Sequence, residues 1–315
     1  MRLVVAVLLA AAALAANAQT WPAKNVRFIV AFAPGGSLDF VTRSIADRVS
    51  QDIGQTVVVE NRPGANGNIA AAFVAKQPAD GYTVLASADA LLSSAHLYKL
   101  DYDALRDLQP VIQFTRQPLV LAVHPSLGVQ NVVELIAAAK KTPGLAYATS
   151  GAGSGQHIAG EWLAKLAGVQ LTHVGYKGGG QAIIDLVGGQ VKIGSLGNTP
   201  VMPHHRAGKL KIIAQSGASR APSLPDVPTY EESGYKGLVI EQWLGLLVPA
   251  GTPKEAVQRL NAAAAKALKE PAVREKLAPQ GLEVVAHSVE EFEKQYRGDY
   301  EKFGKLIREL QIRLD

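Results

Sequence analysis

The hydrophobic residues of this chain fall into short apolar runs that alternate with four-residue repeats. Val26–Phe32 is a β-branched and aromatic run, typical of a buried strand, and a Pro-Gly-Gly turn follows it. From Val41 to Ile53 an apolar residue recurs at every fourth position until Gly54, the pattern of one apolar helix face closed by a glycine stop. This segment therefore predicts a strand, a glycine turn and a helix.

The same alternation continues along the rest of the chain. Further strands are expected at Thr56–Glu60, Tyr82–Ala86, Leu119–Val123, Leu145–Thr149, Thr172–Tyr176, Val191–Leu196 and Lys211–Gln215. Further helices are expected at Ile69–Lys76, Val132–Lys140, 155–166, Gln181–Val187, Glu255–Leu268 and Val289–Leu310, and Pro-rich Ala221–Pro228 is interpreted as an exposed connector. Two successive series of strand and helix units predict two similar α/β lobes with mostly parallel sheets.

Composition narrows the chemistry. The 315 residues are 48% hydrophobic and 19% charged, which is typical of a globular chain long enough for two domains. The sequence contains no cysteine, which excludes disulfides, thiolate metal ligands and a cysteine nucleophile. The net charge of +5 is mild, and basic residues do not gather with aromatic ones, so we expect no nucleic-acid partner.

The first 18 residues have the features of a secretory signal peptide. A basic start at Arg2 precedes the apolar run Leu3–Ala16, and Ala16-Asn17-Ala18 is an A-x-A cleavage site. The apolar run is shorter than the roughly 20 residues that span a bilayer, so the alternative of a membrane anchor is disfavoured. We expect residues 1–18 to be removed and the mature protein to be exported and soluble.

Two glycine-rich loops are candidate anion sites. Ala33, Pro34, Gly35, Gly36, Ser37 and Asp39 follow the first strand and lead into a helix, where free backbone N–H groups and the positive end of the helix dipole attract anions. Ser150–Gly155 occupies the equivalent place in the second series, with Ser154 as a hydroxyl donor and His157 one turn into the helix. Helix N-termini that face each other across a cleft would hold a carboxylate from both sides. The alternatives are an ordinary capped turn for the first loop and a packed histidine for His157.

Glycine access is expected to matter more than charge in these loops. A Cβ at Gly36 or Gly153 should obstruct the ligand or force a strained backbone, whereas Asp39→Asn keeps the size and the capping group.

Enzyme motifs are mostly missing. The G-x-S-x-G pattern fails because Ala152 and Ala148 precede Ser154 and Ser150 by two positions, and Gln156 interrupts G-x-G-x-x-G. The adjacent histidines 204 and 205 point in different directions on a turn or helix, so they make a poor metal site. We therefore predict no catalysis, no cofactor and no metal. An exported α/β hydrolase or isomerase is the enzymatic alternative.

Six blocks of sequence, in this order, resemble the tripartite tricarboxylate transporter substrate-binding proteins, also called Bug proteins. The blocks are Lys24–Phe40, Val57–Asn68, Ala79–Leu85, Val174–Gly178, Asp185–Val191 and Gly245–Pro253. The resemblance implies a periplasmic binding protein of type II fold, with residues 19–121 and 240–315 in one lobe and residues 122–239 in the other. It also implies a monomer that closes on a small organic carboxylate, such as a di- or tricarboxylate, an acidic amino acid or an aromatic acid. Integral membrane transporter subunits then receive the ligand; the alternative partner is a receptor to which the protein presents its ligand as a sensor.

The resemblance also carries over candidate ligand contacts. In the first lobe they are Ala33, Pro34, Gly35, Gly36, Ser37, Asp39, Ser87 and Asp89, and in the second Ser150, Gly151, Ser154, His157 and Asn198, with Tyr176 and Lys177 as weaker candidates. The chain departs from the family pattern at Leu38, Gly175, Lys192 and Gly194-Ser195. The last of these changes lies near the expected pocket floor, so the ligand need not be that of better-known members.

We predict that the mature protein begins near Gln19, because the apolar segment is short and ends in a cleavage site. Intact-mass measurement on the exported protein checks this expectation. A membrane-bound species that retains residues 1–18 would contradict it.

Overall fold

The computed structural model describes residues 21–314. Its strands are β1 (Val26–Val30), β2 (Val57–Asn61), β3 (Thr83–Ala88), β4 (Leu108–Val123), β5 (Leu145–Thr149), β6 (Leu171–Gly175), β7 (Ile193–Gly197), β8 (Lys211–Gln215), β9 (Glu241–Pro249) and β10 (Glu283–Val284). Its α-helices are α2 (Ser37–Ile53), α3 (Asn68–Ala75), α4 (Ala90–Ser94), α5 (Val132–Lys141), α6 (Gly155–Ala167), α7 (Gly179–Val187), α8 (Asn198–Arg206), α9 (Lys254–Lys269), α10 (Pro271–Leu277) and α11 (Val289–Leu310). Short 3₁₀ turns are η1 (Ala65–Gly67), η2 (Pro125–Leu127) and η3 (Ala278–Gln280).

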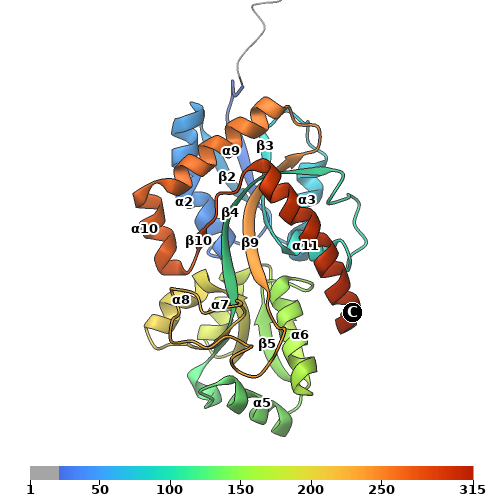
Figure 1. Ribbon diagram of the computed structural model, residues 1–315, viewed down its shortest axis with the longest axis vertical. Coiled ribbons are helices and arrows are strands. Elements are labelled where there is room, and N and C mark those ends of the chain that lie inside the picture. Colours follow the sequence, from blue (N-terminus) through green and yellow to red (C-terminus); the bar gives the residue numbers. More distant parts are fainter. Residues whose placement is uncertain (1–20, 315) are drawn as a thin grey trace, which may run out of the picture.

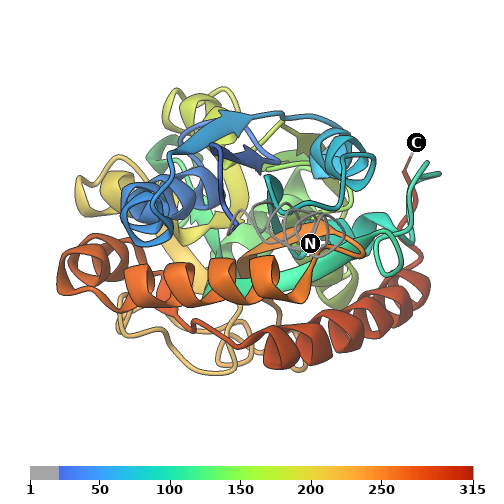
Figure 2. The ribbon, with the colours of Figure 1, turned by 90° about the horizontal axis from the view of Figure 1, so that it is seen from above.

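The first lobe is built on the strand order β2-β1-β3-β9-β4, with β10 added to β4. Strands β1, β2 and β3 are parallel, and β9 runs antiparallel to β3 and β4. Strand β1 contains three consecutive residues that are fully buried, Phe28, Ile29 and Val30. Consecutive buried residues are expected in a strand that is covered by helices on both faces. Helices α9 (orange) and α11 (red) run along one side of this lobe in Figure 2, and α2 packs against α9.

The second lobe has the order β4-β7-β5-β6, with β8 also paired to β4. Strands β5, β6 and β7 are parallel. A separate apolar cluster that includes Leu186, Leu196 and Met202 forms part of its core. In Figure 1 this lobe, with α5 to α8, lies below the first.

Strand β4 belongs to both sheets. Its residues from Leu108 to Pro118 pair with β9, and those from Leu119 to Val123 pair with β7 and β8. Glu241, the first residue of β9, is the register partner of Pro118 in β4. The two strands that connect the lobes therefore lie side by side where they pass from one lobe to the other (Figure 1). Strand β4 changes its pairing partner after Pro118, shortly before the lobe boundary expected after residue 121. Strand β9 begins at Glu241, next to the lobe boundary expected before residue 240.

Most local elements agree with the predictions from the sequence. Helix α2 ends at Ile53 with Gly54 in a left-handed conformation, φ 77°, and α11 has the expected bounds. Strands β9 and β10, the first part of β4 and helices α4, α8 and α10 were not predicted from the sequence. The connector Ala221–Pro228 was expected to be exposed throughout, but Leu224 and Val227 are buried in the second-lobe core.

The predicted signal peptide, residues 1–18, lies outside the described residues. Within residues 21–314 no helix combines the length and the hydrophobicity that a membrane span requires.

Candidate ligand-binding site

A small cavity of about 30 Å³ lies between the lobes. Its walls come from the loops that follow β1, β3, β5, β6 and β7 and from the crossing strand β9. The lining residues are uncharged: Phe32, Gly36, Ser37, Leu38, Ala88, Ser150, Gln156, Gly179, Gly197, Pro200, Gln242 and Leu244. The carboxyl ends of the parallel strands of both lobes therefore meet at one place.

The cavity is lined at the N-termini of four helices. Gly36 and Ser37 begin α2, Gln156 lies in the first turn of α6, Gly179 is the first residue of α7, and Gly197 is the N-cap of α8. The first N–H groups of a helix have no partner inside it, and each helix dipole places positive potential at the same end. Four such ends make the cavity attractive to an anion without any lysine or arginine in its lining.

Side-chain amides join the two lobes and the crossing strands beside this cavity. The Gln117 amide nitrogen donates to Gln242 Oε1 at 2.7 Å, and Gln117 Oε1 accepts from Ser37 Oγ at 3.4 Å and from the Asn198 N–H at 3.2 Å. In the second lobe Gln156 Oε1 accepts from the Ser150 N–H at 2.8 Å. None of the three glutamines was predicted from the sequence, because Gln117 follows Arg116 and Gln242 follows Glu241, so neither stands out as an inward-facing polar residue.

The first-lobe glycine loop contacts the second lobe through backbone atoms of both segments. The Ala33 N–H donates to the Lys177 carbonyl at 3.0 Å. A Cβ added to Gly180 would overlap the carbonyl oxygen of Pro34. Tyr98 OH also donates to the Ala152 carbonyl at 2.8 Å, so the two lobes are in direct contact around the cavity.

Three of the predicted contacts, Gly36, Ser37 and Ser150, line the cavity. Ala33, Pro34 and Gly35 lie in the same loop as Gly36 and touch the second lobe. The Asp39 carboxylate is bound within the first lobe: it accepts from the Gly35 N–H at 3.1 Å, from Arg43 Nε at 2.8 Å and from Asn61 Nδ2 at 2.9 Å. Asp39 therefore holds the loop in place. Ser87 lies in β3 opposite Gly245.

The second-lobe candidates are mostly engaged in the loop's own structure. Ser154 is the N-cap of α6; its Oγ accepts from the His157 N–H at 3.2 Å and donates to the Gly151 carbonyl at 2.7 Å. Gly151 lies against Asn66 of the first lobe. Asn198 Nδ2 donates to the Gly281 carbonyl at 3.4 Å.

His157 faces away from the interlobe cavity. Its ring stacks on His173 with centroids 3.8 Å apart, and its Nδ1 accepts from the Gly153 N–H at 3.0 Å. It lines a different hollow, beside Glu161 and the residues that follow α11. Burial, and then the neighbouring His173, lower the pKa of His157 to about 3. This placement agrees with the interpretation of His157 as a packed histidine.

The expected effect of a Cβ at Gly36 or Gly153 needs correction. Gly36 has φ −81°, so a side chain there is not strained, and its Cβ would contact Gly179 and Gly180 of the other lobe at ordinary distances. Gly153 does have a positive φ of 78°, but its Cβ would lie 2.9 Å from Leu97 Cδ1 of the first lobe. Both positions act on the contact between lobes.

Asp89 is the buried charge at this interface. It is 0% exposed, and within the described residues neither carboxyl oxygen accepts a hydrogen bond of ordinary length and angle, although the Gln242 amide and the Ala90 N–H lie close to it. Its Oδ2 lies so close to Gly155, the first residue of α6, that a Cβ there would overlap it. Burial raises the pKa of Asp89 to about 7; Gln242 beside it lowers the pKa, and the charge of Asp299 raises it further.

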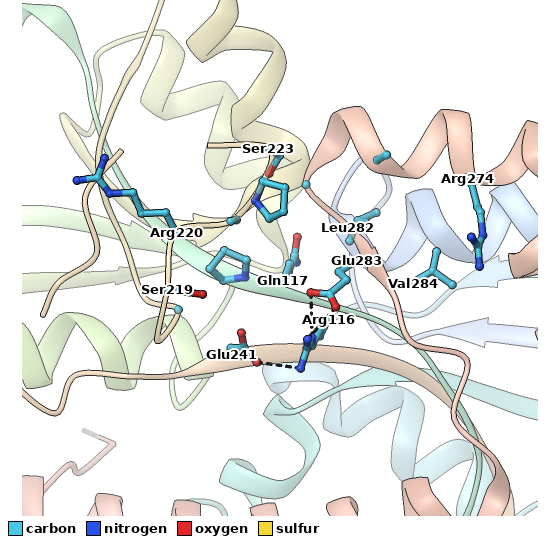
Figure 3. A pocket seen from close by; sticks show the side chains of 16 residues that line it. Arg116, Gln117, Ser219, Arg220, Ser223, Glu241, Arg274, Leu282, Glu283 and Val284 are labelled. Atoms are coloured by element: carbon cyan, nitrogen blue, oxygen red, sulfur yellow. Dashed lines mark hydrogen bonds and ion pairs between the residues drawn. The ribbon is translucent and has the colours of Figure 1, made fainter. Parts of the chain in front are cut away.

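A larger pocket of about 390 Å³ lies along the crossing strands, between β10 and the loop 217–223 (Figure 3). Two of its three arginines are paired: Arg116 binds Glu283 at 2.7 Å and faces Glu241, and Arg220 binds Glu232 at 2.8 Å. The third, Arg274 on α10, is a single cation at the rim and has no helix N-terminus beside it in the lining. Gln117 borders this pocket too, but its amide bonds to the residues of the interlobe cavity. The smaller cavity therefore has the better chemistry for a carboxylate.

We predict that Asp89→Asn favours the closed conformation of the ligand-free protein at pH 8 and so raises its thermal stability. Because the pKa of Asp89 is raised in the folded state, the penalty for burying its charge grows as the pH rises from about 4 to about 7. At pH 8 the variant should melt at least about 2 °C above the unmodified protein, which corresponds to about 1 kcal/mol in a chain of this size. At pH 4.5 the two melting temperatures should differ much less.

Asp39→Asn is the matched control, because the Asp39 carboxylate is fully partnered and its loss should lower the melting temperature at pH 8. Equal changes for Asp89→Asn at both pH values would contradict the prediction.

Comparison with known proteins agrees with this architecture. Residues 41–312 match the family described as "Tripartite tricarboxylate transporter family receptor". BugT of Bordetella pertussis is 34% identical over 317 residues, which cover 99% of this chain and 97% of BugT. An R. palustris protein solved with adipate is 34% identical, with a TM-score of 0.90 over 93% of this chain and 99% of that one. MatC of Rhodopseudomonas palustris, solved with bound malate, is 29% identical, with a TM-score of 0.87 over 91% of this chain and 100% of that one.

The family match begins at residue 41, after the loop that contains Gly36 and Ser37, and covers the rest of both lobes and the crossing strands. The chain therefore belongs to the tripartite tricarboxylate transporter family receptors, the periplasmic substrate-binding proteins also known as Bug proteins, and it has their two-lobed α/β fold.

Proposed function

We propose that this protein captures a small organic carboxylate in the periplasm by lobe closure and delivers it to the membrane subunits of a tripartite tricarboxylate-type transporter. The observation that carries the proposal is the uncharged cavity between the lobes, lined at the N-termini of four helices. The adipate and malate bound by two relatives support a small carboxylate as the ligand class.

The chemistry of the cavity suits a bound carboxylate. A buried carboxylate needs several hydrogen-bond donors, because an unpaired charge in a low-dielectric site is costly. Backbone N–H groups at α2, α6, α7 and α8 and the hydroxyl groups of Ser37 and Ser150 surround one small volume. Of these donors, Ser37 Oγ and the Asn198 N–H of α8 are bonded to Gln117 Oε1 in the described structure and would exchange that partner for the ligand. Such donors are rigid, and they release the ligand more readily than a lysine or arginine ion pair would.

The lobes must separate for a ligand to enter. Measured as the space that the centres of water molecules can occupy, one water needs about 10–15 Å³, so a cavity of about 30 Å³ is far too small for a four-carbon diacid. Two segments connect the lobes: β4, at Pro118, and the chain that leads into β9, at Glu241. These two segments can bend together as a hinge. Ligand binding and lobe movement are therefore one event.

Ser154 and His157, close together at the start of α6, do not form a catalytic pair. Ser154 Oγ is hydrogen-bonded to Gly151 and to the backbone of His157, while the His157 ring faces His173. A binding role therefore accounts better for the site than hydrolysis does. Turnover assays on esters and lactones test the enzymatic alternative, and light scattering tests the expected monomer.

Mass spectrometry of molecules that co-purify with the protein from its periplasm is the most direct test of the function. A carboxylic acid released on unfolding supports the proposal. Uptake of that acid by cells with and without the gene then tests delivery to a transporter, and unchanged uptake would favour the sensor role.

We predict that ligand binding makes the molecule more compact. The open protein should show a larger radius of gyration, because helix N-termini from both lobes must reach one ligand. Small-angle scattering with and without saturating ligand measures the change. An unchanged radius, with binding confirmed by calorimetry, would point to a rigid pocket.

We also predict that Gly180→Ala prevents full closure. Its Cβ would overlap the Pro34 carbonyl, so the lobes must stay apart, and affinity should fall at least about tenfold, or about 1.4 kcal/mol. Gly298→Ala in α11, where a Cβ meets open space, is the matched control. Calorimetry and scattering on both variants check the result; equal affinities for Gly180→Ala and Gly298→Ala would contradict it.

A further inference from the structure

We propose that Asp89 makes this protein selective for carboxylates that carry a hydrogen-bond donor, an ammonium or hydroxyl group, on the carbon next to the carboxylate. The inference rests on the proposed function and adds the class of ligand. It comes from the position of one side chain between the lobes.

Asp89 belongs to the first lobe, directly after β3, and its carboxyl group is pressed against Gly155 at the start of α6 in the second lobe. The side chain is fully buried, and neither of its oxygens accepts a hydrogen bond of ordinary length and angle. The donors close to it are uncharged: the Gln242 amide and the backbone N–H groups of Ala90 and of Asp89 itself. Its neighbours border the cavity: Ala88 precedes it in the chain, Gln242 lies beside it, and Gln156 follows Gly155. The carboxyl group is therefore at the edge of the ligand site.

A buried carboxylate without a donor is unfavourable, so closure requires either a proton or a donor from the ligand. The elements packed around Asp89 supply no cation. Strand β9 contributes the uncharged Gln242 and Trp243, α11 contributes Asp299, which has the same charge, and α6 carries His157, whose ring is turned to His173. The raised pKa of Asp89 has burial as its main cause and agrees with this geometry.

A ligand that enters must separate Asp89 from the first turn of α6. The N–H groups of Gly155 and Gln156 then face the ligand from one side, and the Asp89 carboxylate faces it from the other. The ligand's own carboxylate suits the helix N-terminus. A donor on the adjacent carbon would reach Asp89, so 2-amino and 2-hydroxy acids complement both groups at once. An unsubstituted diacid offers Asp89 nothing but a like charge.

Matched acids that differ only at that carbon test the proposal. The panel has three matched sets, and each acid is measured by calorimetry at pH 8. Succinate is compared with malate and aspartate, glutarate with 2-hydroxyglutarate and glutamate, and adipate with 2-aminoadipate. We expect the amino or hydroxy acid of the preferred length to bind about tenfold or more tightly than its unsubstituted partner, as a hydrogen bond to a charged group implies.

Asp89→Asn should reduce that preference to within about threefold, because the neutral amide no longer attracts an ammonium group. Glu161→Gln is the control: it removes a negative charge from the same helix, α6, on the side of Tyr147 and away from the cavity. The control should keep the preference of the unmodified protein.

The unmodified protein gives a second measurement that does not depend on the variant folding. Affinity for an unsubstituted diacid should rise as the pH falls from 8 to 5, since Asp89 must take up a proton on closure, while affinity for the matched amino acid should change little. Calorimetry in buffers of different ionisation enthalpy measures that proton uptake.

The outcomes separate the two proposals. If no acid in the panel binds, the carboxylate-binding function and the inference both fail. If acids bind and the unsubstituted ones bind as tightly as the substituted ones, or Asp89→Asn keeps the preference, the function stands and the role of Asp89 is wrong.

Discussion

Strand β4 determines how the rest of the molecule is arranged, because it is hydrogen-bonded in both lobes. Its first part pairs with β9 and its last residues pair with β7 and β8. Register shifts in its pairing with β9 and with β8 bend it between the two sheets. Once one strand joins both sheets in this way, the carboxyl ends of β1 and β3 face those of β5 and β7 across a single gap. The helices that follow these strands then point their N-termini into that gap.

The site depends on backbone dipoles rather than on charged side chains. Serines and glutamines line the cavity, and Gln117 connects Ser37, Gln242 and the start of α8 in one hydrogen-bonded group. Uncharged donors can hold a buried anion without an opposing charged side chain that would have to be desolvated each time a ligand binds. Asp89 is the exception to this uncharged lining, which is why its burial bears on the choice of ligand.

Small residues allow the two lobes to come together. The loop Pro34–Gly36 meets Gly178–Gly180 through backbone atoms, and the Ala33 N–H reaches the Lys177 carbonyl. A side chain at Gly180 would hold the lobes apart. Glycines in the first loop therefore serve closure, and Gly35, with φ 83°, is the position there that needs a left-handed backbone.

Local patterns in the sequence were sufficient for most strands and helices of each lobe, for the two glycine loops and for the anion-binding chemistry of their helix N-termini. They were not sufficient for α8, whose N-terminus also borders the cavity. Helix α2 and its stop at Gly54 follow from four-residue periodicity alone, because both depend on neighbours within one helix. The path of β4 and β9, the inward position of Gln117 and Gln242, the outward turn of His157 and the burial of Asp89 were decided by tertiary structure. Each of these features results from contact between residues far apart in the chain, such as Asp89 with Gly155. A local sequence pattern carries no information about which loops of the two lobes come into contact.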